Sequence, residues 1–417
     1  MGLRLIIFFI FLIYLCSTSY TRNRVYLASF LVFIYFLYPE AYIWGIKEYR
    51  IVFILNIVLA LFLFLNKEFV SPFQDKLSRY FFFFFVSVLL SAFAAKGSKE
   101  LSLDYAFLFF KVYLFWILLR SCLRSEYNIK FFYWVSLLSI TVLSGWGIEQ
   151  YLRGNIRLEG FGGGQIVGSN QIAAAMVWAV PIAFFFIIKH KGNLRLLCAF
   201  CLIILLGGIV CTQSRQAIVA LVLCLPFYFK YVKNKAALIL GGLLLAILAV
   251  TFVPPEFYQR METIQSYEED ASAQGRLEQW RGAYRMFLDY PLLGVGGKNY
   301  YNLAHNYVEY PRVTHNTYFQ ILAEEGFVGI SLFLVLMVTA ILRANKLMKQ
   351  SITGEKSQNV FYYAAIAQMN LIGLLVICLF QNKAEHEFLY WPIAVIAALS
   401  SPTLLTQFGQ QHKKEKK

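Results

Sequence analysis

The chain of 417 residues is 59% hydrophobic, 18% aromatic and only 15% charged, a composition that excludes an ordinary soluble globular protein. Its formal net charge of +15 does not indicate nucleic-acid binding, because the lysines and arginines lie in short loops between apolar runs, as membrane topology signals do. We therefore expect an all-α multi-pass membrane protein that has membrane lipid, and no nucleic acid, as its partner.

Apolar runs long enough to cross a membrane recur along the whole chain. A helix needs roughly 20 apolar residues to cross the hydrocarbon core, and the sequence offers about 12 to 13 such runs. They lie at about 3–18, 25–43, 50–66, 80–96, 104–121, 131–150, 170–188, 194–211, 215–232, 236–253, 317–342, 360–380 and 387–405. The first run lacks a small-residue cleavage pattern and indicates a retained anchor, although whether it spans the whole bilayer stays open. We expect a single membrane domain over residues 1–417.

Basic residues recur at every second loop and predict the orientation of the chain. Cytoplasmic loops of membrane proteins carry an excess of Lys and Arg. This rule places on the cytoplasmic side the segments 67–79, 120–130, 189–195, 230–235, 343–349 and 412–417. The alternate segments then face outward, namely 97–103, 151–169, 213–215, 254–316 and 381–387.

The outward loop 254–316 is the longest interval between apolar runs. A stripe at helical spacing predicts an amphipathic helix on the outer membrane surface, and it consists of Leu277, Trp280, Tyr284 and Phe287. Arg281 and Arg285 lie on another face, where they either form a solvated edge or serve a substrate. We expect Pro291 to end this helix and the glycines of residues 294–297 to supply a flexible turn.

The sequence predicts no metal and no cofactor. The acidic residues 268–270 of the long loop are consecutive, so on a helix they point about 100° apart and do not converge on one ion. Cys198 and Cys201 have CxxC spacing but sit within an apolar run, where a thiol behaves as a small hydrophobic side chain.

Three short motifs lie on the predicted outward side: TQSR (212–215), GRLEQW (275–280) and THNTYF (314–319). Arg215 either anchors a helix end by snorkelling or pairs with an anion. Guanidinium groups match phosphate oxygens bidentately, and a neutral imidazole such as that of His315 is a suitable general base near pH 7. Two arginines and one histidine on one membrane face suggest transfer from a lipid-linked phosphate donor.

Longer stretches around these motifs resemble the O-antigen ligase and polymerase superfamily of bacterial membrane glycosyltransferases. The stretches are TQSRQA (212–217), GRLEQWRGAYRMFLDYPLLGVG (275–296) and THNTYFQILAEEGFVG (314–329). RLEGFGGGQIVGSNQIAAAM (157–176) is similar to the entry to a central helix of that family through Asn170. The resemblance covers roughly residues 150–335. Gln216 departs from the family pattern, and this departure concerns the geometry of the turn and not the positive charge of Arg215.

The resemblance implies a GT-C-like, metal-independent and inverting glycosyltransferase of the bacterial inner membrane, with its active face periplasmic. The donor would be a glycan on undecaprenyl diphosphate, and the acceptor a lipid A core sugar or another periplasmic glycan. Arg215 and Arg276 would hold the diphosphate, while His315 would activate the acceptor hydroxyl. The supporting residues would be Asn170, Trp280, Arg281 and Asn316. His305 has no counterpart in the family and reads as structural.

Two alternatives stay open. A polymerase would use the same donor site but a second lipid-linked repeat as acceptor, and the single moderate outer loop only slightly favours a ligase. A transporter is suggested by Lys111, Glu324, Glu325 and the charged residues of the segment 383–387. However, a transporter should place several ionisable groups near mid-span in broken helices, with symmetry between its halves, which the sequence does not clearly show.

Overall fold

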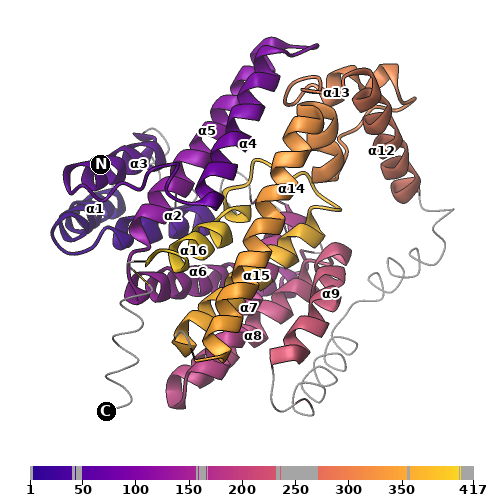
Figure 1. Cartoon of the computed structure of the whole chain (residues 1–417). Helices are drawn as coiled ribbons and strands as arrows, with labels where there is room; N and C mark the ends of the chain where they lie inside the picture. The colour runs from indigo at the N-terminus through magenta and orange to yellow at the C-terminus, as the bar shows by residue number, and fades with distance from the viewer. Residues whose placement is uncertain are drawn as a thin grey trace.

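The computed structural model describes residues 3–39, 43, 49–155, 158, 166, 168–231, 235, 271–354, 357–402 and 404. Within these residues every regular element is a helix (Figure 1). The helices are α1 (Leu3–Thr21), α2 (Val25–Leu37), α3 (Ile51–Leu65), α4 (Lys76–Phe93), α5 (Lys99–Cys122), α6 (Glu126–Leu152), α7 (Ser169–Lys189), α8 (Gly192–Cys211), α9 (Arg215–Tyr231), α12 (Ala271–Asp289), α13 (Tyr300–Leu303), α14 (Thr317–Ile352), α15 (Gln358–Ile377) and α16 (Trp391–Leu399), with the 3-10 turns η3 (Ala304–Asn306) and η4 (Glu387–Leu389).

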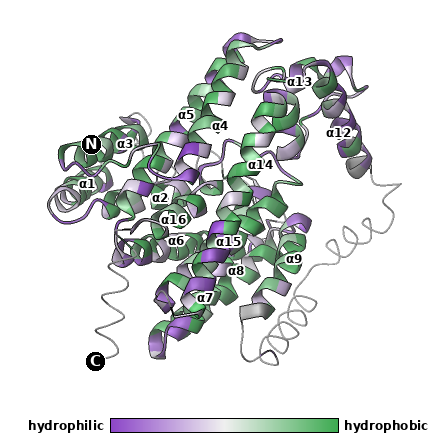
Figure 2. Ribbon diagram, in the orientation of Figure 1, coloured by the Kyte–Doolittle hydropathy of each residue, from purple (hydrophilic) through white to green (hydrophobic). Residues whose placement is uncertain are grey.

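The helices confirm a multi-pass membrane protein. Eight of the described helices are long and apolar enough to cross a bilayer, and these are α1, α4 to α8, α15 and the part of α14 from Gly326 to Ile352. Four shorter apolar helices lie at α2, α3, α9 and at residues Glu387–Leu399. The predicted run 236–253 lies outside the described residues. Figure 2 shows hydrophobic residues throughout the helical body, whereas α12 is largely hydrophilic.

Capping side chains extend several helices beyond the apolar runs that predict them. Asp75 accepts a hydrogen bond from the backbone N–H of Ser78, so α4 begins at Lys76, four residues before the expected span. Ser98 caps α5 in the same way by accepting from the N–H of Leu101. A side-chain cap satisfies backbone donors that hydropathy does not register, so helix starts and span starts differ.

Helix α7 lies at the centre of the bundle and packs against α6, α8, α9 and α15. Trp178 of α7 is fully buried and meets Trp391 of α16 edge to face, with ring centroids 5.9 Å apart. Such aromatic pairs contribute stabilisation beyond their buried area. Helix α16 therefore packs into the centre of the helix bundle.

Contacts between loops support the predicted alternation of the two membrane sides. Among the segments predicted to be cytoplasmic, Glu68 pairs with Arg124 at 3.6 Å and Lys189 pairs with Glu126 at 3.3 Å. Glu68 also pairs at 3.1 Å with Arg24 of the α1–α2 connection, for which no side was predicted. These contacts join the α1–α2, α3–α4, α5–α6 and α7–α8 connections at one end of the bundle. Which end faces the cytoplasm stays a prediction.

The segments predicted to face outward meet at the other end. The backbone N–H of Ser98 donates to Asn299 Oδ1 at 2.8 Å, and the Ser102 hydroxyl donates to the carbonyl oxygen of Gly297 at 3.0 Å. Lys96 N–H donates to the carbonyl oxygen of Val295 at 3.0 Å. The α4–α5 turn thus supports the chain that connects α12 to α14 (Figure 1).

Helix α14 breaks at Gly326, whose φ of 65° and ψ of −162° interrupt the helical geometry. A Cβ atom at this position would lie 2.5 Å from the carbonyl oxygen of Leu292, so both the conformation and the space require glycine. The candidate span begins at this break, whereas the sequence predicts one span over residues 317–342. The prediction misses the break because a hydropathy window averages across it.

Residues 291–296 pair with both sides of this break, an arrangement that we call the backbone interlock. Its hydrogen bonds run from Phe327 N to Pro291 O (2.7 Å), Val328 N to Leu292 O (3.2 Å), Val295 N to Ala323 O (3.0 Å) and Gly296 N to Glu324 O (2.9 Å). Gly294 is buried against the backbone of Glu324, which a Cβ would approach to 2.5 Å. These glycines form an ordered contact instead of the flexible turn that the sequence suggests, because close approach of two backbones also selects glycine.

Helix α12 is confirmed, and the face that packs on the rest of the protein lies beside the predicted apolar stripe. Ala283 and Met286 are fully buried and Gln279 is 1% exposed. In contrast, Tyr284 of the predicted apolar stripe is 50% exposed. The helix therefore packs on α14 through small and amide side chains, and its aromatic stripe is only partly covered.

Candidate active site

The turn between α8 and α9 brings two of the predicted site residues together. Gln213 adopts a left-handed conformation with a φ of 52°, which reverses the chain between the two helices. The hydroxyl of Ser214 then donates to Asn170 Oδ1 at 2.9 Å. Arg215 follows as the first residue of α9 and is partly buried. The TQSR motif and the start of α7 therefore lie in direct contact.

Two buried amides flank Arg215. Gln213 and Gln216 are each 7% exposed, and among the described residues neither side chain has a hydrogen-bond partner. A buried polar group without a partner costs about 1–3 kcal/mol, which a bound ligand or water offsets by supplying the hydrogen bond. Gln216, the departure from the family pattern, thus lies in the first turn of α9 as a polar group available to a ligand.

The segment after α15 connects this turn to the start of α14. The Gln381 side chain donates to the carbonyl oxygen of Asn170 at 3.0 Å, and the carbonyl oxygen of Gln381 accepts from the Thr317 hydroxyl at 2.7 Å. Asn382 Oδ1 accepts from the Thr314 hydroxyl and from the N–H of Asn316, both at 2.9 Å. Sequence reasoning missed Gln381 and Asn382, although both lie in a segment predicted to face outward.

Asn316 is the N-cap of α14 and is 3% exposed. Its side-chain oxygen accepts from the N–H groups of Tyr318 at 2.9 Å and Phe319 at 3.1 Å, while its amide donates to the carbonyl oxygen of Leu379 at 3.1 Å. All these partners are backbone groups, so Asn316 fixes the chain immediately after His315.

His315 adopts an uncommon backbone conformation between two buried residues. Its φ is 48°, in the left-handed region that a non-glycine residue occupies only when its surroundings impose it. Thr314 and Asn316 are buried, whereas His315 itself is accessible. The turn therefore leaves the imidazole accessible while its neighbours hold the backbone.

The electrostatic surroundings of His315 favour a neutral ring. Partial burial lowers the pKa of His315, and the positive charges of Arg276 and Arg312 lower it further. A neutral imidazole accepts a proton, which is what a general base requires. The same effect places Arg276 within electrostatic reach of His315, as the predicted site demands.

Trp280 joins α12 to the histidine turn. Its indole N–H donates to the carbonyl oxygen of Thr314 at 2.9 Å, and its ring stacks on Phe319 with centroids 5.5 Å apart and planes at 15°. Arg276 lies one helical turn earlier on the same face of α12. Because Trp280 makes these protein contacts, a positioning role fits it better than direct substrate contact.

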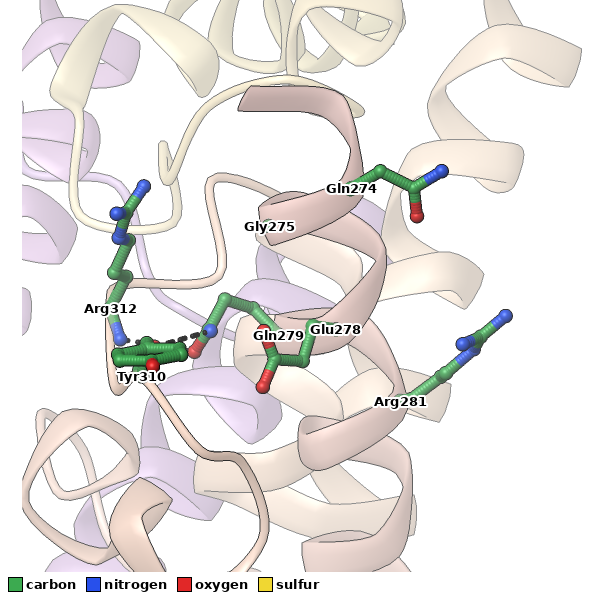
Figure 3. A pocket seen from close by; sticks show the side chains of 7 residues that line it. All are labelled: Gln274, Gly275, Glu278, Gln279, Arg281, Tyr310 and Arg312. Carbon is green, nitrogen blue, oxygen red and sulfur yellow. Dashed lines mark hydrogen bonds between the residues drawn. The ribbon is translucent and has the colours of Figure 1, made fainter. Parts of the chain in front are cut away.

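Arg281 lies apart from this network, on the exposed side of α12. It borders a groove with Arg312 and Tyr310 (Figure 3). Arg285 is also exposed but does not line the groove. His305 makes a local contact, with Nδ1 2.9 Å from the carbonyl oxygen of Asn302, in agreement with a structural role.

Apart from Lys111, the charged residues that suggested transport include a buried group around Glu324, Glu325 and Lys383. Burial raises the pKa of Glu324 and of Glu325, and it lowers the pKa of Lys383 to about 7. Lys383 Nζ lies 3.4 Å from His386 Nε2. Within the part of the chain that the structure describes, no group of three or more potential ligands could hold a metal ion. Lys111 is exposed, with its Nζ 4.6 Å from the ring centroid of Phe107.

Comparison with known proteins agrees with these motifs. Residues 200–334 match the family model described as O-antigen ligase. No curated protein matches the chain. The matched region contains the α8–α9 turn, α12, the histidine turn and the break in α14. The match supports the resemblance to the O-antigen ligase and polymerase superfamily.

Proposed function

We propose that this protein is a membrane glycosyltransferase that moves a glycan from undecaprenyl diphosphate to an acceptor hydroxyl. The observation that carries the proposal is the joining of the predicted motifs through a few contacts. Ser214 bonds to Asn170, Gln381 bonds to Asn170 and to Thr317, and Trp280 bonds to Thr314 beside His315. These residues come from five separate parts of the chain, and their contacts bring Asn170 and the motifs with Arg215, Trp280 and His315 close together.

In the proposed mechanism, Arg215 and Arg276 hold the diphosphate of the donor. Guanidinium groups bind phosphate oxygens bidentately and stabilise the charge that develops as the leaving group departs. Neutral His315 takes the proton of the acceptor hydroxyl, whose oxygen attacks the anomeric carbon from the face opposite the phosphate. The new glycosidic bond forms as the bond to phosphate breaks, so the configuration inverts and undecaprenyl diphosphate leaves.

Supporting residues hold this arrangement in place. Asn170 fixes the turn before Arg215 through Ser214, and Asn316 fixes the chain after His315. Arg281 contacts the glycan from the groove side. The reaction uses no metal, and it takes place at the periplasmic face of the bacterial inner membrane.

The acceptor distinguishes the two forms of the proposal. We favour a ligase, in which a lipid A core sugar or another periplasmic glycan accepts the chain. A polymerase would use a second lipid-linked repeat at the same donor site. Supplying each acceptor separately to the purified protein, and analysing the products by mass spectrometry, separates the two.

The test uses the full chain in lipid nanodiscs with a lipid-linked glycan donor, an acceptor and excess EDTA. We expect transfer under these conditions and a loss of about 10²–10⁴-fold in rate for His315→Ala, the range that loss of a general base typically gives. The matched control is His305→Ala, which removes a histidine of the same loop that bonds only locally. An unchanged rate in His315→Ala, or activity that returns only with added Mg²⁺, contradicts the mechanism.

A further inference from the structure

A groove runs across α12 beside the proposed active site. Its volume is about 350 Å³, at the lower end of the range for small-molecule sites. Its lining includes Gln274, Gly275, Glu278, Arg281, Tyr310 and Arg312. Figure 3 shows Arg281 and Gln274 along one border and Arg312 with Tyr310 along the other, with Gly275 between them.

The two arginines of the groove are available to a ligand. Among the described residues, no acidic side chain forms an ion pair with Arg281 or Arg312. Glu278 also lines the groove, but its Oε1 accepts from the backbone N–H of Glu309 at 2.9 Å. The groove therefore presents two guanidinium groups and one carboxylate, which leaves it with a positive balance.

Gln279 holds one side of the groove in place. Its amide nitrogen donates to the carbonyl oxygen of Tyr310 at 2.9 Å, and its oxygen accepts from the N–H of Arg312 at 3.1 Å. Gln279 is 1% exposed and is itself bonded to the hydroxyl of Tyr300 at 3.1 Å. Tyr310, in contrast, is 65% exposed. The backbone is thus fixed while the phenol ring stays open to a ligand.

One residue of the groove lies within electrostatic reach of the proposed base. Arg312 lies three residues before His315, and its positive charge acts on the imidazole together with that of Arg276. A ligand bound to Arg312 would therefore alter the electrostatic surroundings of His315.

We propose that this groove binds a negatively charged sugar residue, a pyranose that bears a carboxylate or a phosphate, within the glycan that reaches the site. This inference rests on the proposed glycosyltransferase function and names its substrate class. The guanidinium group of Arg312 binds the anionic group, while that of Arg281, which points away from it on the opposite border (Figure 3), donates to a sugar hydroxyl. The Tyr310 ring covers an apolar face of the sugar, and Glu278 and Gln274 bind its hydroxyl groups.

The test measures binding without turnover, so that it can fail separately from the transferase function. Saturation-transfer NMR on the full chain in nanodiscs would compare methyl glucuronide, glucose 6-phosphate and methyl glucoside. We expect signal from one or both charged sugars and none from the neutral sugar at the same concentration. Binding of methyl glucuronide would identify the anionic group as a carboxylate, and binding of glucose 6-phosphate would identify it as a phosphate.

Substitutions in the groove test whether the NMR signal of the charged sugars arises from binding there. Arg281→Gln and Arg312→Gln should each weaken binding by about tenfold, as expected for loss of a charge-assisted hydrogen bond. Arg285→Gln is the matched control, because Arg285 is exposed on the same helix outside the groove. Equal binding of methyl glucoside, equal binding of inorganic phosphate alone, or unchanged binding in both arginine variants would overturn the proposal.

Discussion

Arginines serve different purposes in two regions of this molecule. Between α3 and α4, Glu68 pairs with both Arg24 and Arg124, so each of these arginines has an acidic partner within the protein. We call this trio the balanced region. Along the groove on α12, Arg281 and Arg312 have no acidic partner among the described residues. The comparison teaches that position alone does not identify a functional arginine in a membrane protein. What matters is whether the fold already provides its counter-charge.

The largest expected effect comes from the arginines assigned to the donor diphosphate. Arg215→Ala and Arg276→Ala should each abolish measurable transfer, because a charged contact to phosphate is worth about 1.5–3 kcal/mol and more if it strengthens in the transition state. Lys at either position should restore only part of the rate, since the bidentate fork is lost. Turnover of a labelled lipid-linked donor measures both.

Arg124→Ala is the control for this pair of substitutions. Arg124 belongs to the balanced region and lies 3.6 Å from Glu68. We expect it to keep full transfer activity. Equal losses in Arg124→Ala and Arg276→Ala would erase the distinction between the two regions.

The next effect concerns the backbone interlock beneath the site. Gly326→Ala should lower the free energy of unfolding by about 2 kcal/mol or more, because it adds a clash with Leu292 O to the strain of a positive φ. Gly354→Ala is the control, since Gly354 has a φ of 80° but open space around its Cβ. A thermal-shift measurement in detergent compares the two, and equal destabilisation would show that the clash is relieved.

A smaller effect is expected in the pH dependence of transfer. Arg312 disfavours the protonated form of His315, so Arg312→Gln should raise the pKa of His315. The active form is the neutral ring, and the acidic limb of the kcat/KM profile should therefore move to higher pH. Arg285→Gln should leave the profile unchanged. A shift to lower pH in Arg312→Gln would rule out His315 as the titrating base.

The smallest effect should follow loss of the balanced cluster itself. Glu68→Gln removes the shared partner of Arg24 and Arg124, and we expect it to cost about 1 kcal/mol or less, as is usual for ion pairs near a surface. Transfer activity should not change. A loss of transfer with unchanged melting temperature would indicate that this region also contributes to function.

The helices were predictable because hydropathy and capping are local properties of the sequence. Apolar runs located the described spans, and the helical spacing of Leu277 and Trp280 located α12. The predicted loop 254–316 is described only from residue 271 onward, so its first part stays untested. The assignment of residues 1–417 to one membrane domain also stays a prediction.

The site was predictable only as a set of motifs. The contacts between these motifs depend on Gln381 and Asn382, which lie far from Asn170 in the sequence. No local sequence pattern marks these two residues as part of the site. The buried face of α12 was missed for a related reason. Gln279, Ala283 and Met286 do not form a hydrophobic stripe, yet the small side chain and the satisfied amide pack closely on α14.

The backbone interlock also constrains how the chain is made. Val295 and Gly296 find their acceptors at Ala323 and Glu324, which leave the ribosome later. The amides of Val295 and Gly296 therefore bond to water or to other partners at first. They can form the interlock only after the start of α14 has been synthesised and has reached the same side of the membrane. The backbone interlock consequently forms late in biosynthesis. A chain truncated before residue 323 would contain all three arginines of α12 and the histidine turn but would lack the interlock.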